Sequence, residues 1–207
     1  MGLIRQKILQ LADNCKPNIE RNCDVLAAVL EEGEVADRRQ AAREIVRCLD
    51  AARTLVSRLK REEDLSVREV ILNTLLRLND PSAFSELADC LRSEDAALRN
   101  EVIEGFKQIG SEVDPVLHAL LTDADPDVRI FVVNILNSQR HPEVESWLIK
   151  VIEQDCNVNV CATAVDLLCE VATEASVDPL IGLKARFASE PYIQFAADLA
   201  LKRIREA

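Results

Sequence analysis

The chain has 207 residues, a net charge of −11 at pH 7, 48% hydrophobic residues and only 3% aromatic residues. Its acidic balance repels nucleic acid phosphates and anionic lipid headgroups, which argues against binding to either. No apolar run reaches the roughly 18 residues that a membrane-spanning helix needs, and no secretory signal is recognisable, so we expect a cytoplasmic protein.

The first predicted elements are two helices, over residues 2–13 and 18–32, separated by a polar segment that contains Pro17. This helix pair does not follow the pattern that repeats through the rest of the chain. We therefore expect residues 1–33 to form an N-terminal helical cap that covers the first repeat.

A pattern of about thirty residues recurs from residue 34 to residue 207. Each copy is aligned on one anchor position, occupied in turn by Arg39, Arg68, Arg99, Arg129, Cys161 and Gln194. Apolar residues follow the anchor by three, seven and ten positions, the spacing of one face of a helix, except for Gln139 ten positions after Arg129. Four positions before the anchor lies a residue suited to capping a helix N-terminus. These residues are Asp64, Asp95, Asp125, Asn157 and Glu190, with Val35 as the exception. Self-similarity at this period predicts a solenoid of stacked helical hairpins.

Each copy is predicted to contain a first helix near the anchor, a polar break and a second helix. The first copy spans 37–62, and the next four second helices are expected over 81–93, 114–122, 142–154 and 177–188. The last copy has only its first helix, over 190–205. In the second copy either Asp64 or Ser66 could begin the first helix. The predicted inward residues of the second helices are Leu55, Leu59, Leu87, Leu91, Leu117, Leu121, Leu148, Ile152, Leu180 and Leu183.

The segments Asp64-Leu-Ser-Val-Arg68, Asp95-Ala-Ala-Leu-Arg99 and Asp125-Pro-Asp-Val-Arg129 resemble HEAT repeats. The short period is similar to that of the phycobilin-lyase-like, or E-Z, type. The resemblance implies an all-α fold, a right-handed α-solenoid (superhelix) of about five helix-hairpin repeats, with residues 34–207 forming one continuous domain after the cap. It also implies that the recurring aspartates and arginines link adjacent repeats through hydrogen bonds.

The seven cysteines are odd in number and form no CxxC pair. Cys48, Cys90 and Cys169 fall within apolar helical patterns, so we expect the cysteines to pack as small hydrophobic residues in a reducing compartment. A metal or redox role remains an alternative for Cys156, Cys161 and Cys169, which are close in sequence.

Catalytic signatures are absent from the sequence. Deoxyhypusine hydroxylases, which resemble this fold, hold two irons with His-Glu pairs, whereas this chain has only His118 and His141. Neither a P-loop, nor HExxH, nor a Ser/His/Asp set occurs. We expect no catalytic residue, no cofactor and no metal.

These features predict a non-enzymatic scaffold or adaptor that presents a concave surface of second helices to another protein. The acidic surface favours a partner with basic features, while the sequence leaves the oligomeric state open. The candidate partner contacts are Glu86, Asp89, His118, Trp147, Lys150 and Arg186. Trp147 occupies a position that is polar in a sister copy, which is typical of an interface anchor, although a single tryptophan is also often a core residue.

A tetrapyrrole lyase-like or chaperone-like subunit that acts on a carrier protein is the alternative function. Bilin lyase subunits share this repeat type, and a tetrapyrrole needs basic groups for its propionates beside an apolar surface. A set of this kind lies near the C-terminus: Trp147, Lys184, Arg186, Phe187 and Tyr192.

Overall fold

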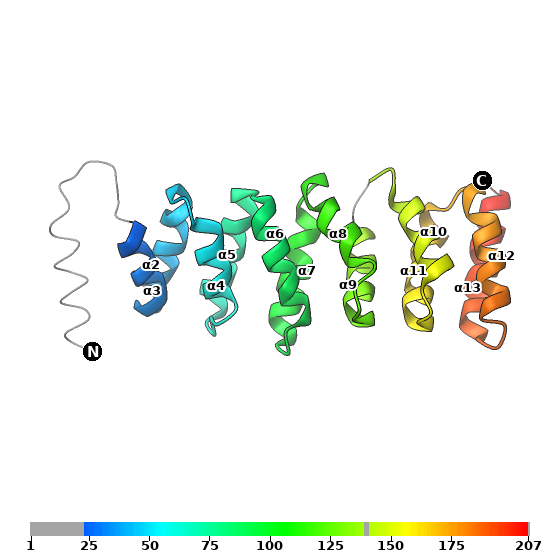
Figure 1. Ribbon diagram of the computed structural model, residues 1–207, viewed down its shortest axis with the longest axis horizontal. Coiled ribbons are helices and arrows are strands. Elements are labelled where there is room, and N and C mark those ends of the chain that lie inside the picture. The colour runs from blue at the N-terminus through cyan, green and yellow to red at the C-terminus, as the bar shows by residue number, and fades with distance from the viewer. Residues whose placement is uncertain (1–22, 139–140, 207) are drawn as a thin grey trace. The chain divides into compact units, whose positions relative to one another are not determined.

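The computed structural model describes residues 23–138 and 141–206, and within these ranges every regular element is a helix (Figure 1). The predicted helix over 2–13 lies outside the described residues. The chain divides into two compact units, Met1–Gly105 and Phe106–Ala207, with the division inside one helix, α7. The all-α fold class predicted from the repeat is confirmed.

The first unit contains helices that match the predicted first two copies and the beginning of the third. Its elements are α2 (Cys23–Glu32), α3 (Val35–Glu44), the 3-10 turn η1 (Ile45–Arg47), α4 (Ala51–Leu59), α5 (Leu65–Leu78), α6 (Pro81–Ala88), η2 (Asp89–Arg92) and the beginning of α7 (Ala96–Gln108). Helix α3 packs on α2 and α5, and α4 packs on α5 and α6. First helices therefore neighbour first helices, as stacked hairpins require.

The second unit repeats the same arrangement. After the end of α7 come η3 (Ser111–Val113), α8 (Asp114–Leu120), α9 (Pro126–Leu136), α10 (Val144–Gln154), α11 (Val158–Val171), η4 (Glu174–Ser176), α12 (Val177–Arg186) and α13 (Pro191–Glu206). Helix α11 packs between α9 and α13, while α10 packs on α12. The first helices α9, α11 and α13 thus form one layer, and the second helices α10 and α12 belong to another.

The apolar core follows the predicted helical faces closely. All ten inward residues predicted on the second helices are buried. The position three residues after the anchor is also buried in every copy, because these small or branched side chains lie where neighbouring helices approach. Counted from the predicted anchors, the residues are Ala42, Ile71, Val102, Val132, Ala164 and Ala197.

The predicted N-caps are confirmed in several copies. Asp64 accepts hydrogen bonds from the backbone N–H groups of Ser66 and Val67, so α5 begins after Asp64 and Ser66 is not its cap. Asp125 and Asn157 cap α9 and α11 in the same way. These side chains satisfy backbone donors that a helix start leaves unpaired.

The predicted links between repeats are also present. The guanidinium of Arg68 donates to the backbone oxygen of Glu62 just upstream and to the carboxylate of Asp95 in the next copy. Arg129 donates to the backbone oxygen of Asp123 and forms two hydrogen bonds with Asp155. Each arginine therefore closes the connection before its own helix and ties it to the following copy.

The register predicted for the first copy is wrong by one residue. Arg38, and not Arg39, donates to Gly33 and to Glu62, and the backbone N–H of Arg38 bonds to the oxygen of Glu34. Aligned on Arg38, the first copy has an acidic residue at the cap position, so Val35 is no longer an exception. The sequence Arg38-Arg39 offered two anchors, and only packing distinguishes them.

Glu62 is the centre of a buried ionic cluster in this first copy. Its side chain is 1% exposed and accepts hydrogen bonds from Arg38 and Arg58, at 2.7 to 2.9 Å, and from the backbone N–H groups of Glu63 and Asp64. Burial raises the pKa of Glu62, but the hydrogen bonds from Arg38, Asp64 and Arg58 outweigh burial and lower that pKa from 4.5 to about 2.

Two further expectations for the first copy need correction. Leu49, predicted on the inward face ten residues after the anchor, is fully exposed, because α3 ends at Glu44 and the chain tightens into η1 before reaching it. Cys23 and Cys48 form a disulfide, with Cα atoms 5.8 Å apart, and are not free packing residues in a reduced protein. Residue spacing alone does not reveal that α2 lies against η1.

Candidate functional site

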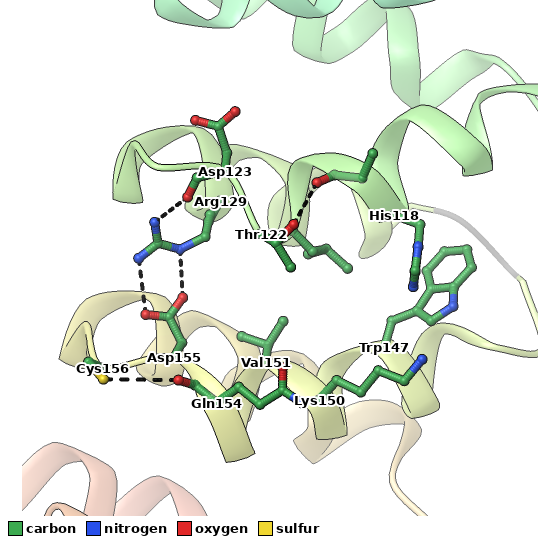
Figure 2. Close-up of a pocket in the computed structure, with 12 residues that line it drawn as sticks. His118, Thr122, Asp123, Arg129, Trp147, Lys150, Val151, Gln154, Asp155 and Cys156 are labelled. Carbon is green, nitrogen blue, oxygen red and sulfur yellow. Dashed lines mark hydrogen bonds and ion pairs between the residues drawn. The ribbon is translucent and has the colours of Figure 1, made fainter.

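A groove of about 480 Å³ lies in the second unit between the second helices α8 and α10 (Figure 2). His118 and Ala119 of α8 form one wall, and Trp147, Lys150, Val151 and Gln154 of α10 form the other. The connections after each helix and the anchor of α9 complete the lining, with Leu121, Thr122, Asp123, Arg129, Asp155 and Cys156. Three of the six predicted contact residues, His118, Trp147 and Lys150, are brought together here.

One end of the groove is an aromatic cluster built around Trp147. Its side chain is buried, with 5% exposed, and the imidazole of His141 stacks on the indole at a centroid distance of 5.1 Å. His118 lies tilted against the same indole at 5.4 Å. His141 is half-buried, because Trp147 provides a ring against which it packs.

Asp114, at the start of α8, contacts His141 of this aromatic cluster. Its Oδ2 atom lies 3.3 Å from Nε2 of His141, whereas its buried Oδ1 atom has no hydrogen-bond partner among the described residues. Burial raises the pKa of Asp114, and attraction to His141 opposes that rise. The contact holds the ring of His141 over Trp147.

The opposite end of the groove is fixed by the link between repeats. The guanidinium of Arg129 is held by both oxygens of Asp155 and by the backbone oxygen of Asp123. The hydrogen bonds that Arg129 donates to the Asp155 carboxylate raise the pKa of Arg129. The Arg129 guanidinium and the Asp155 carboxylate bond to each other, so they have few hydrogen-bonding groups left for a ligand. This end of the groove therefore acts as a rigid wall.

Unengaged polar groups lie between the two ends. Within the described part of the chain, the Lys150 ammonium and the Gln154 side-chain amide have no hydrogen-bond or ion-pair partner, and both lie one helical turn apart on α10. Below them Val151 and Leu121 are buried. The groove therefore combines an apolar floor with one cation and one amide that are available to a ligand.

The other predicted contacts lie elsewhere. Glu86 and Asp89 belong to the first unit, on α6 and η2, where Asp89 is exposed and near Lys60 and Arg92, at 3.7 and 3.5 Å. Arg186 is on α12 and does not line the groove.

Arg186 has a structural role that sequence reasoning missed. Its guanidinium donates to the backbone oxygens of Ile152, Glu153 and Asp155 at the end of α10, and to the sulfur of Cys161. Cys161 occupies the anchor position of the fifth copy and reaches only the oxygen of Asp155. Arg186 thus supplies, from the second helix of the same copy, the guanidinium that the fifth anchor lacks. The sequence signal that could have indicated this role is the cysteine at position 161, where most copies have an anchor arginine.

Ligand sites for metals are not found in the described ranges: no three histidine, cysteine or acidic side chains there are placed to hold an ion. Cys161 is buried, and burial raises the pKa of its thiol to about 11. No described helix is long and apolar enough to cross a membrane.

Stacked helical hairpins, capped by Asp or Asn and linked by anchor arginines, define the class as HEAT-like helical repeats. Residues 113–202 match the family of HEAT repeats, which confirms the resemblance that the sequence motifs indicate. A comparison with curated protein sequences found no match.

Solved structures of repeat proteins are similar to the chain in fold. Mini spindles TOG3 of Drosophila melanogaster is 15% identical, with a TM-score of 0.50, over 86% of this chain and 92% of that one. An archaeal HEAT-like repeats protein from Thermococcus onnurineus NA1 is 17% identical, with a TM-score of 0.48, over 98% and 92%. The complex of CpcE and CpcF of phycocyanin lyase from Nostoc sp. PCC7120 is 15% identical, with a TM-score of 0.35, over 92% and 97%.

Proposed function

We propose that the protein is a non-enzymatic adaptor that binds a segment of another protein in the groove between α8 and α10. The observation that carries this proposal is the pair of unengaged polar groups on Lys150 and Gln154, placed above an apolar floor and beside the buried Trp147 cluster. Buried apolar surface supplies affinity in protein interfaces, and a few polar groups fix the orientation of the partner.

The groove favours a bound segment with defined chemistry. An apolar side chain of the partner fits against Val151 and the edge of Trp147, while the Gln154 amide bonds to the partner's backbone. Lys150 favours an acidic side chain or a backbone oxygen at that point. At longer range the net charge of −11 attracts a partner whose overall charge is positive, and this attraction weakens with salt.

The experiment is affinity capture from the native host with three purified baits, followed by identification of the proteins retained. Wild-type protein is compared with a double variant, Lys150→Glu and Gln154→Ala, and with Glu153→Lys. Glu153 is exposed on the same helix and does not line the groove, so its variant controls for a change of charge. We expect a partner that is retained by wild type and Glu153→Lys and lost by the double variant. Equal retention by all three baits refutes the groove as the binding site.

The tetrapyrrole alternative makes a separate prediction. The residues suggested for it are engaged in other contacts: Lys184 pairs with Asp198, and Arg186 binds backbone oxygens of α10. Titration of the purified protein with biliverdin and with haem, followed by absorption spectroscopy, separates the two functions. An adaptor leaves the spectra unchanged, whereas a stoichiometric shifted band would support the lyase-like alternative.

A further inference from the structure

Helix α13 exposes a row of large apolar side chains on the side away from its core. Tyr192, Phe195 and Leu199 are 52%, 66% and 37% exposed, and their spacing of three and four residues places them on one face. The opposite face of the same helix, with Ile193, Ala197 and Ala200 among its residues, is fully buried against the unit. Exposed rows of this kind are uncommon on surfaces that stay in water.

The repeat itself does not require this row, as the sister copies show. Phe195 and Leu199 lie one and five positions after the anchor Gln194. The same two positions are the exposed residues Glu69 and Asn73 in α5. Five positions after the anchor, α9 has Asn134 and α11 has Asp166, and both side chains are exposed. Polar residues therefore satisfy the fold at these positions, and α13 departs from them for a reason other than folding.

The apolar character continues across the neighbouring first helices. One position after the anchor, α9 has Ile130 and α11 has Ala162, both half-buried, in line with Phe195 of α13. Because α11 packs between α9 and α13, these three residues form a row across the layer. The Tyr192 hydroxyl is bonded to Asp166 of α11, which holds the tyrosine ring in place beside the row.

Charges around this row differ in sign between its two sides. The exposed charges of α9 and α11 are acidic, with Asp127, Asp166 and Glu170. The exposed charges of α13 have a basic excess of one: Asp198, Lys202, Arg203, Arg205 and Glu206, with Lys202 3.8 Å from Glu206 and Arg203 donating to the backbone oxygen of Cys169. Residues 177–207 hold five basic and four acidic residues, a net charge of +1 in a chain of net charge −11. A surface with an acidic side and a basic side is complementary to itself when a second copy is rotated by half a turn.

We propose that the outer face of the α9–α11–α13 layer is a dimer interface that takes a second copy of this chain. A two-fold axis places α13 of one protomer against α9 and α11 of its partner, so that Phe195 and Leu199 are covered. The basic end of α13 then meets the acidic side of the other layer. The groove between α8 and α10 lies on the other layer of helices, so that dimerisation and partner binding use separate surfaces.

The test is the molar mass in solution, measured by sedimentation equilibrium over a range of concentrations and by light scattering after gel filtration. Wild type is compared with Phe195→Glu, with Leu199→Lys and with Asn100→Glu. Asn100 is the exposed residue at the position of α7 that corresponds to Phe195, so it is a matched control. Far-UV circular dichroism and a thermal melt establish that each variant is folded.

We expect wild type and Asn100→Glu to dimerise with the same dissociation constant. Both row variants should weaken the dimer by at least tenfold, since each buries a charge in an apolar contact. Salt should weaken the wild-type dimer as well, because charges of opposite sign meet across the interface. A wild-type chain that stays monomeric at about 200 µM, far above the micromolar range typical of weak specific association, overturns the proposal and assigns the face to a different protein. A dimer that folded Phe195→Glu and Leu199→Lys leave intact overturns it as well.

Discussion

The ionic cluster around Glu62 allows a test of how much a buried carboxylate stabilises the first unit. Replacing Glu62 by Gln keeps the shape of the side chain and removes the charge that Arg38 and Arg58 surround. The pKa of Glu62 falls from 4.5 to about 2 on folding. Each pKa unit corresponds to about 1.36 kcal/mol, so the carboxylate stabilises the folded state by about 3 kcal/mol near neutral pH. The variant should lose that amount of unfolding free energy.

The stabilisation that the Glu62 carboxylate provides depends on pH. Because the folded pKa is below the unfolded pKa, the stabilisation is complete above about pH 5 and is lost as the pH falls from 4.5 through 2. At pH 3 the difference between wild type and Glu62→Gln should shrink to about 1.4 kcal/mol. Urea unfolding followed by circular dichroism at pH 7 and pH 3 measures both values, with the exposed neighbour Glu63→Gln as control. A Glu62→Gln variant as stable as the control at pH 7, or a loss that does not shrink at pH 3, would refute the reasoning.

Two further predictions concern the aromatic cluster and the disulfide. Trp147→Ala should lower the unfolding free energy by about 3 to 5 kcal/mol, because the buried indole supports His118 and His141, whereas Trp147→Phe should retain much of the stability in urea unfolding. A loss below about 1 kcal/mol for the alanine variant would show that the indole is not a core residue. Reduction of the Cys23–Cys48 disulfide, which closes a loop with a sequence separation of 25, should destabilise the first unit by up to about 3 kcal/mol. Peptide mapping without reductant should recover the linked pair, and a reductant should leave the melting temperature of a Cys48→Ser variant unchanged.

The features of the fold that depend on local pattern could be predicted from the sequence. Burial of the leucines on the second helices and capping by Asp64 and Asp125 follow from helical periodicity and from short-range hydrogen bonding. Errors appear where the local pattern is ambiguous. Arg38 and Arg39 both fit an anchor, and a shift of one residue changes which of them faces Glu62.

Contacts between distant residues were harder to predict. Nothing in the spacing of the two histidines indicates that both lie on Trp147, because His141 reaches the indole from a connection and His118 from a different repeat. The same limit applies to Cys23 and Cys48. For the candidate site, the sequence identified Lys150 and Trp147 but not the groove that they share, which exists only once α8 and α10 are side by side.

The hydrogen bonds of Arg186 limit how far the second unit can be truncated from its C-terminal end. In most copies the anchor belongs to the helix that immediately follows the connection, so a hairpin carries its own closing group. The carbonyl end of α10, however, depends on a side chain that the chain reaches more than thirty residues later. A fragment that stops before residue 177 lacks Arg186 and would leave those backbone oxygens without their hydrogen bonds. The truncation would therefore destabilise the α9–α10 hairpin, although all of its residues are still present. Domain boundaries for expression or grafting should therefore keep α10 and α12, and with them residues 144–186, together.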